Sequence, residues 1–188
     1  FNKEFLNSLF ILALPISLQQ TLSALLNLID VSMVGQLGQL ELGSVGLVAK
    51  FFFIATHVLI GLSSGIGVLS AQFFGKKDAQ GGRQVLALSL LITSVITLPL
   101  SLASWLAPTE VVGLFSNNPE IIALGASYLK ATALSHLFTG AIMAYAASLR
   151  GIREAKIPMT AGLISVGANT VLNYLLIFGA GPFPSLGL

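Results

Sequence analysis

Five apolar runs dominate this sequence, and each is longer than the roughly 20 residues that a helix needs to cross the hydrocarbon core of a membrane. They lie near residues 5–37, 42–74, 83–106, 120–149 and 157–178. The runs are much longer than the roughly 10 residues of a membrane β-strand, and they do not alternate apolar with polar residues. The sequence therefore predicts an all-α integral membrane protein with about five transmembrane helices.

Composition supports a membrane location and excludes several other classes of protein. Hydrophobic residues make up 55% of the chain and charged residues only 9%, whereas about a quarter of a soluble domain is charged. The formal net charge of +2 comes from cations in short loops, so we expect no nucleic-acid partner. The chain has no cysteine, which excludes disulfides and thiolate metal sites. No linker divides residues 1–188, so a single membrane domain is expected.

The distribution of Lys and Arg predicts the orientation of this domain. Seven of the nine cations fall on one side of a five-span zigzag: Lys3, Lys76, Lys77, Arg83, Arg150, Arg153 and Lys156. By the positive-inside rule, the N-terminus and the loops at 75–83 and 150–157 are cytoplasmic. Lys50 and Lys130 lie inside spans, and we expect them to extend toward the opposite surface along their aliphatic stems.

The ends of the sequence and the number of spans suggest a part of something larger. The chain starts at Phe1 rather than Met, has an odd number of predicted spans, and ends in "GAGPFPSLGL". We therefore expect it to be a fragment of a longer membrane protein.

Asp30 is a carboxylate within the first apolar run, in the stretch "SALLNLIDVSMVGQLG". It shares one helix face with Gln19, Ser23 and Asn27, because the spacings are 4, 4 and 3 residues. A charge at the centre of a bilayer costs at least about 2.5 to 3.5 kcal/mol, and such residues usually have a function. Asp30 is the main candidate for a functional residue.

Two further runs carry polar stripes at helical spacing. The fifth has Ser165, Asn169 and Asn173, with Tyr174 beside them, and the fourth has Tyr128, Thr132, Ser135 and Thr139. Together with the Asp30 face, these stripes imply either a shared internal cavity or a polar seam between helices. Hydroxyl groups on membrane helices usually serve only to hold the helices together. The two asparagines therefore matter for function only if they face Asp30.

Several other residues have both a structural and a functional interpretation. Pro15 removes a helical hydrogen bond and marks a bend or hinge in the first run, or is passively tolerated there. Pro99 has no evident polar stripe near it and is expected to be passive. His57 and His136 are interpreted as packing residues, and the Gly61–Gly65 pair predicts close helix packing. The G-x-S-x-G match at 61–65 lies in a membrane run, so no hydrolase or other enzyme is expected.

Several blocks occur together in a characteristic order. After Pro15 come "LIDVSMVGQLG", "ELGSVGL", "GIGVLSAQFFGKKD", "SLRGIREAKIP" and "NTVLNYLLIFG". In this order they resemble the N-terminal lobe of the multidrug and toxic compound extrusion (MATE) transporters, with the DinF-like branch most similar. The resemblance extends over essentially the whole chain.

The resemblance implies a twelve-helix antiporter of two six-helix lobes, in the inner membrane of a bacterium. Its substrates are cationic or amphipathic drugs, exported against a proton or sodium gradient, and no organic cofactor or bound metal is needed. The sixth helix and the C-terminal lobe would lie outside these residues. The resemblance makes Asp30 the cation-coupling residue, with Tyr128, Asn169 and Asn173 near it and Pro15 as the helix proline. Some relatives carry a second acid at the position of Asn173, and its absence here favours protons over Na⁺.

These residues predict how a proton could drive transport. Partial burial favours the neutral form of a carboxyl group, and a charged Asp30 needs donors such as the asparagine amides and the Tyr128 hydroxyl. The difference in contacts between the two forms can shift a conformational equilibrium. Sodium coupling, a flippase-type exporter of lipid-linked saccharides, and a membrane scaffold that transports nothing are the alternatives.

Overall fold

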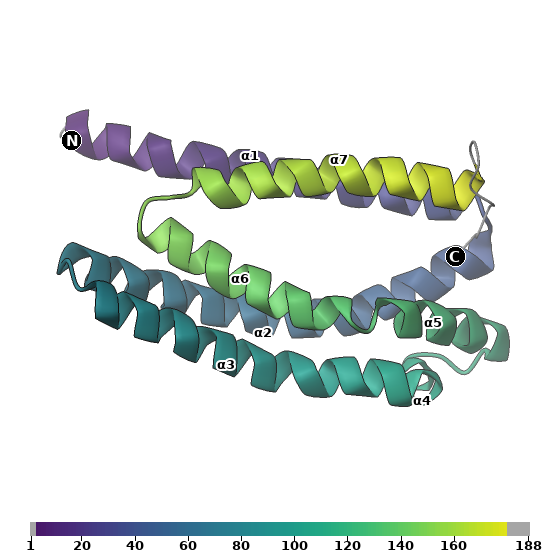
Figure 1. Ribbon diagram of the computed structural model, residues 1–188. Helices are drawn as coiled ribbons and strands as arrows, with labels where there is room; N and C mark the ends of the chain where they lie inside the picture. The colour runs from purple at the N-terminus through teal and green to yellow at the C-terminus, as the bar shows by residue number, and fades with distance from the viewer. Residues whose placement is uncertain (1–2, 180–188) are drawn as a thin grey trace.

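A computed structural model describes residues 3–179, which form seven α-helices (Figure 1). They are α1 Lys3–Gly35, α2 Gln39–Gly75, α3 Ala79–Leu106, α4 Pro108–Gly113, α5 Pro119–Thr132, α6 Ser135–Gly151 and α7 Lys156–Phe178. No strand occurs within residues 3–179, as the sequence predicts. Most of the "GAGPFPSLGL" segment lies outside the described residues.

The short breaks between helices contain residues that suit helix ends. Asp78 precedes α3 and its side chain accepts a hydrogen bond from the Gly81 amide at 2.9 Å. Asn118 precedes α5 and accepts from the Glu120 amide at 2.9 Å, with Pro119 at the first helical position. Such residues satisfy amides that have no partner inside the helix. The predicted boundaries of the apolar runs therefore agree with the helices to within a few residues.

The fourth predicted span differs from the prediction because it is broken. It forms two helices, α5 and α6, whose axes differ by 51°. The Ala133 carbonyl at the break accepts a hydrogen bond from Ser101 of α3 at 2.8 Å. Helices α2, α3 and α7 are each long and apolar enough to cross a membrane, and the α5–α6 pair together makes a fourth such span among the described residues.

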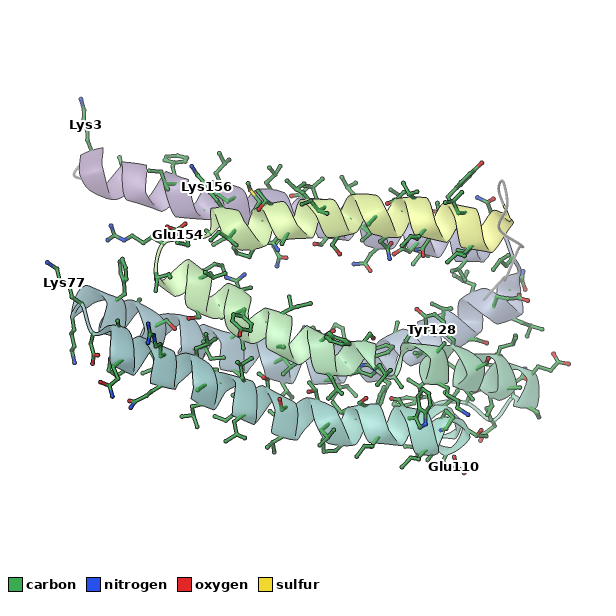
Figure 2. The ribbon with its side chains drawn as sticks, in the orientation of Figure 1. Lys3, Lys77, Glu110, Tyr128, Glu154 and Lys156 are labelled. Atoms are coloured by element: carbon green, nitrogen blue, oxygen red, sulfur yellow. The ribbon has the colours of Figure 1, made fainter. Side chains whose placement is uncertain are left out.

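The long helices form two layers. Helices α1 and α7 lie side by side in one layer, and α2, α3 and α6 form the other (Figure 1). Successive spans run in opposite directions, so the start of α1, the α2–α3 loop and the α6–α7 loop lie at the same end. Figure 2 shows Lys3, Lys77 and Lys156 there, with Glu110 at the opposite end. The predicted clustering of cations at one end is confirmed.

The buried core lies in the layer formed by α2 to α6. One cluster consists of Val48, Val112 and Leu129, and a second of Ile66, Ala144 and Ala147. Helix α6 approaches α2 very closely, because a Cβ on Gly151 would lie 2.6 Å from the Gly67 carbonyl oxygen. The expected packing role of Gly61 and Gly65 is wrong, since a Cβ on either would meet nothing within 4 Å.

Large apolar side chains cover the outside of the protein. Leu28 of α1 is 69% exposed and Ile164 of α7 is 73% exposed. In water such a surface would be unusual, but it suits a chain whose outer face lies against lipid. This exposure extends along both helices of the outer layer.

Candidate functional site

The side chain of Asp30 on α1 faces α7 and binds an asparagine of that helix. The Asn173 side-chain amide donates a hydrogen bond to Asp30 Oδ1 at 2.9 Å. The same amide donates to Asn169 Oδ1 at 3.1 Å. All three side chains are half-buried. The structure therefore brings together the carboxylate and the two asparagines that the sequence selected, with Asn169 as an acceptor from Asn173 rather than as a second donor to Asp30.

This cluster lies close to one end of the two helices rather than at their centre. Asp30 is five residues before the end of α1, and Asn173 is five residues before the end of α7. At 1.5 Å per residue, Asp30 is about 7.5 Å from the helix end. That end is opposite the cation-rich end of the molecule. The cluster is thus near the surface that the positive-inside rule places outside.

The rest of the polar face of α1 helps to align the two helices. The Gln19 amide donates to the Pro158 carbonyl of α7 at 3.3 Å. The Asn27 amide bonds within its own helix, to the Ser23 carbonyl at 3.1 Å. Contacts at Gln19 and at Asp30 therefore hold α1 and α7 in one parallel register. Of this predicted stripe, Gln19 and Asp30 reach α7 by hydrogen bonds that the structure describes.

Tyr128 belongs to the bundle beside this pair of helices. It is half-buried on α5, and no hydrogen bond joins it to Asp30 in the described part of the chain. Tyr128 also lines a pocket of about 290 Å³ between α2, α3, α5 and α6. Asp30 does not line that pocket. The described pocket therefore does not join the three predicted polar stripes, because Tyr128 lines it and Asp30 does not.

The polar stripe of the fourth span faces this pocket, as its spacing predicts. Thr132, Ser135 and Thr139 line it together with Tyr128. Each of the three hydroxyls donates to a carbonyl three or four residues earlier, Thr132 to Tyr128 and Thr139 to Ser135 at 2.9 Å each. These donors are already used within the helix, so they offer a bound molecule mainly acceptor oxygens.

Helix α3 carries a buried polar stripe that the sequence interpretation missed. It consists of Ser89, Thr93, Thr97, Ser101 and Ser104, none more than 5% exposed. The helical spacing of 4, 4, 4 and 3 residues could have revealed it. Pro99 lies within this stretch, so the expectation that no polar stripe lies near it is wrong. Thr97 reaches α6, where a Cβ on Gly140 would lie 2.9 Å from its methyl group.

Other polar residues in the spans have packing partners. His136 is 5% exposed, lines the 290 Å³ pocket and stacks on Phe52 with ring centres 4.0 Å apart. His57 lies 2.8 Å from the Phe53 carbonyl of its own helix. The Lys130 ammonium lies 5.9 Å from the centre of the Trp105 ring. These contacts are consistent with packing roles.

Pro15 is buried within α1, which continues through it as one helix. The bend or hinge at this position stays a prediction. Among residues 3–179, no group of three His, Cys, Asp or Glu side chains lies close enough to hold a metal ion.

These features define a multi-span α-helical membrane protein in which a half-buried carboxylate is bound by an asparagine amide of a neighbouring helix. The MatE family model matches residues 15–175, and the chain belongs to this family. Over 94% of its length the chain is 30% identical to the probable multidrug resistance protein NorM of Rhizobium meliloti. Over 96% it is 25% identical to the probable multidrug resistance protein YoeA of Bacillus subtilis.

A solved structure shares the fold. A MOP superfamily transporter from Pyrococcus furiosus superposes on 96% of this chain with a TM-score of 0.84 and 23% sequence identity. The chain spans 38% of the NorM relative, 39% of YoeA and 39% of the solved transporter. It therefore corresponds to somewhat less than half of these proteins.

Proposed function

We propose that this chain forms the N-terminal lobe of a cation-coupled multidrug antiporter that exports cationic or amphipathic xenobiotics. The similarity to proteins named as multidrug resistance proteins, over 94% and 96% of the chain, supports this proposal. Their greater length supports the expectation that a sixth helix and a C-terminal lobe complete the transporter. The DinF-like branch is a finer assignment that rests on the sequence blocks alone.

The Asp30–Asn173 hydrogen bond is the observation on which the coupling role rests. Asp30 lies inside α1, five residues before its end. The other six acids lie in the first turn of a helix or in a loop: Glu4, Glu41, Asp78, Glu110, Glu120 and Glu154. Charged Asp30 accepts the 2.9 Å hydrogen bond from α7. Protonation removes the charge and weakens this contact, since hydrogen bonds to ionised groups are stronger than those between neutral groups. Proton binding therefore changes how firmly α1 holds α7.

We propose a proton rather than Na⁺ as the coupling ion. A hard cation needs several oxygen ligands at once. Beside the Asp30 carboxylate, the neighbouring amide oxygen of Asn169 already accepts a hydrogen bond from Asn173. A proton needs only the carboxylate.

The location of the cluster fits proton entry from outside a bacterial inner membrane. The cation-rich end, with Lys77 and Lys156, is cytoplasmic by the positive-inside rule. Asp30 is near the opposite end of α1. A proton from the periplasmic side therefore has a short path to it.

Substituting Asp30→Asn in the complete transporter tests this function. The amide has nearly the shape of the carboxylate but cannot titrate, so we expect drug efflux driven by a pH gradient to be abolished at unchanged membrane levels. Glu110→Gln removes an exposed carboxylate elsewhere and should leave efflux intact. Normal efflux by the Asp30→Asn variant would refute the coupling role.

A further inference from the structure

A second pocket, outside the Asp30 region, lies at the cation-rich end of the molecule. It has a volume of about 920 Å³ and is enclosed by the end of α2, the start of α3, the end of α6 and the α6–α7 loop. Three cations line it, Lys77, Arg83 and Arg153, together with one carboxylate, Asp78. Segments far apart in the sequence thus place positive charge around one hollow.

None of the three cations is neutralised by a described neighbour. No ion pair within 4.0 Å joins Lys77, Arg83 or Arg153 to an acid whose side chain the structure describes. The one carboxylate of the pocket, Asp78, caps α3 by accepting a hydrogen bond from the Gly81 amide, and its single negative charge does not balance three cations. All three cationic residues are exposed. The pocket therefore offers positive charge to a ligand.

Two of these cations occupy backbone positions that favour glycine. Lys77 has φ 56° and Arg153 has φ 67°, and in the described chain these are the two non-glycine residues with positive φ. They follow the same helix-ending geometry: the Asp78 amide bonds to the Phe73 carbonyl at 3.0 Å, and the Glu154 amide to the Leu149 carbonyl at 2.8 Å. Glycine is the usual residue at the left-handed position of this ending. Both helix ends therefore hold a cation at a conformational cost.

The pocket is amphipathic, and a hydrogen bond between two of its lining residues joins α2 to α6. Phe74, Leu86 and Ile152 supply apolar walls next to the cations. At the base, the Ser70 hydroxyl of α2 donates to the Ser148 hydroxyl of α6 at 3.2 Å. Since α2 ends at Gly75 and α3 begins at Ala79, the pocket lies where the apolar helices meet their polar loop. In a helix that spans a bilayer, this boundary is where lipid headgroups are expected to meet acyl chains.

We propose that this pocket binds the phosphate group of an anionic phospholipid, with the lipid backbone against the apolar walls. The ligand chemistry is a phosphate held by Lys77, Arg83 and Arg153. A lipid is favoured over free phosphate because the pocket is larger than a phosphate needs and has an apolar side. Basic pockets between membrane helices on the cytoplasmic side are known to suit anionic headgroups. Orientation by the positive-inside rule requires cations in these loops, but it does not require them at left-handed positions around one hollow.

The test measures lipid binding to the complete transporter in detergent by native mass spectrometry. The probes are short-chain phosphatidylglycerol, phosphatidylcholine of the same chain length, and inorganic phosphate. Substituting Lys77→Gly or Arg153→Gly removes a pocket cation and also relieves the backbone. Lys77→Arg keeps the charge, and Lys156→Gln removes a cation from the same end outside the pocket. No drug or pH gradient is present, so the result is independent of the coupling role of Asp30.

We expect phosphatidylglycerol to bind in preference to phosphatidylcholine, and each glycine variant to bind it about fivefold more weakly, as expected for one cation near an anionic surface. The glycine variants should melt at the same or a higher temperature than the wild type, while Lys77→Arg and Lys156→Gln retain lipid binding. Equal binding of both lipids, or equal losses in Lys156→Gln and Lys77→Gly, would overturn the site. A different result would overturn the lipid as the ligand: inorganic phosphate binds and the glycine variants weaken this binding, while the two lipids bind equally. The bound phosphate would then be free phosphate and not a lipid headgroup.

Discussion

Helices α3 and α7 are both apolar enough to cross a membrane, but they are buried to very different extents. In the most apolar window of α3, 28% of the residues are buried, whereas in that of α7 none are. Helix α3 packs against α2 and α6 through buried hydroxyls such as Thr93 and Thr97. Helix α7 contacts mainly α1, through half-buried amides.

We expect this difference to separate a fixed part of the molecule from a part that proton binding at Asp30 alters. Thr93 and Thr97 of α3 donate to carbonyls of their own helix, and α6 approaches Thr97 at Gly140. No ionisable group takes part in these contacts. Between α1 and α7, the contact that joins Asp30 to Asn173 depends on a titrating group. A hydrogen bond between membrane helices contributes only about 0.6 to 2 kcal/mol. We therefore expect that breaking this hydrogen bond loosens the contact between α1 and α7 without unfolding the layer of α2 to α6.

The largest effect is expected from Gly151→Ala in the fixed part. The new Cβ would lie 2.6 Å from the Gly67 carbonyl oxygen of α2, so the two helices must separate. Overpacking of this kind costs about 1 to 3 kcal/mol, and thermal unfolding of the purified protein should show the loss. The control is Gly61→Ala, whose Cβ meets nothing within 4 Å. Equal stability of the two variants would contradict the close approach of α6 to α2 at Gly151.

A smaller effect, on transport rather than stability, is expected from the asparagines of α7. Asn173→Ala removes the donor to Asp30, while Asn169→Ala removes only an acceptor for Asn173. We expect efflux to fall several-fold for Asn173→Ala and less for Asn169→Ala, because water can replace part of the lost hydrogen bonding. Both proteins should melt close to the wild type. The reverse order of efflux would show that the Asp30 contact is not the important one.

The smallest effect on binding is expected from Pro15→Ala. If α1 bends at Pro15 during transport, restoring the missing hydrogen bond makes the straight helix easier to keep, and efflux falls. Drug affinity should change little, since Pro15 lies about 22 Å along the helix from Asp30 at 1.5 Å per residue. Efflux and drug binding are measured on one preparation. Normal efflux would remove the hinge from the account.

The sequence predicts the helices well because length and hydropathy are local properties. It also selects Asp30 and the asparagines of α7 as polar stripes, and names Asn169, Asn173 and Tyr128 as donors to a charged Asp30. Of these three, the structure describes a hydrogen bond to Asp30 from Asn173. The break between α5 and α6 was not predictable in this way. Its interior, Ala133 and Leu134, contains neither glycine nor proline, and the freed Ala133 carbonyl is satisfied by Ser101, which lies 32 residues away in the sequence.

The helix contacts were harder to predict for a similar reason. Gly61–Gly65 and Gly151 are equally plausible packing sites by composition, yet only Gly151 meets another backbone. Which glycine is used depends on how α2 and α6 cross, and this depends on the whole set of side chains between them. The same holds for Tyr128, whose place in the 290 Å³ pocket with residues of α6 depends on the bend after α5.

Proton release on drug binding tests the coupling role of Asp30 most directly. A cationic dye is added to the purified complete transporter in weakly buffered solution, and a pH indicator records protons while dye binding is followed in the same sample. At a pH where Asp30 is partly protonated, the wild type should release protons as the dye binds. Asp30→Asn should bind the dye and release none. Equal release from the two proteins at equal dye binding would contradict the account, because the displaced proton would then come from another group.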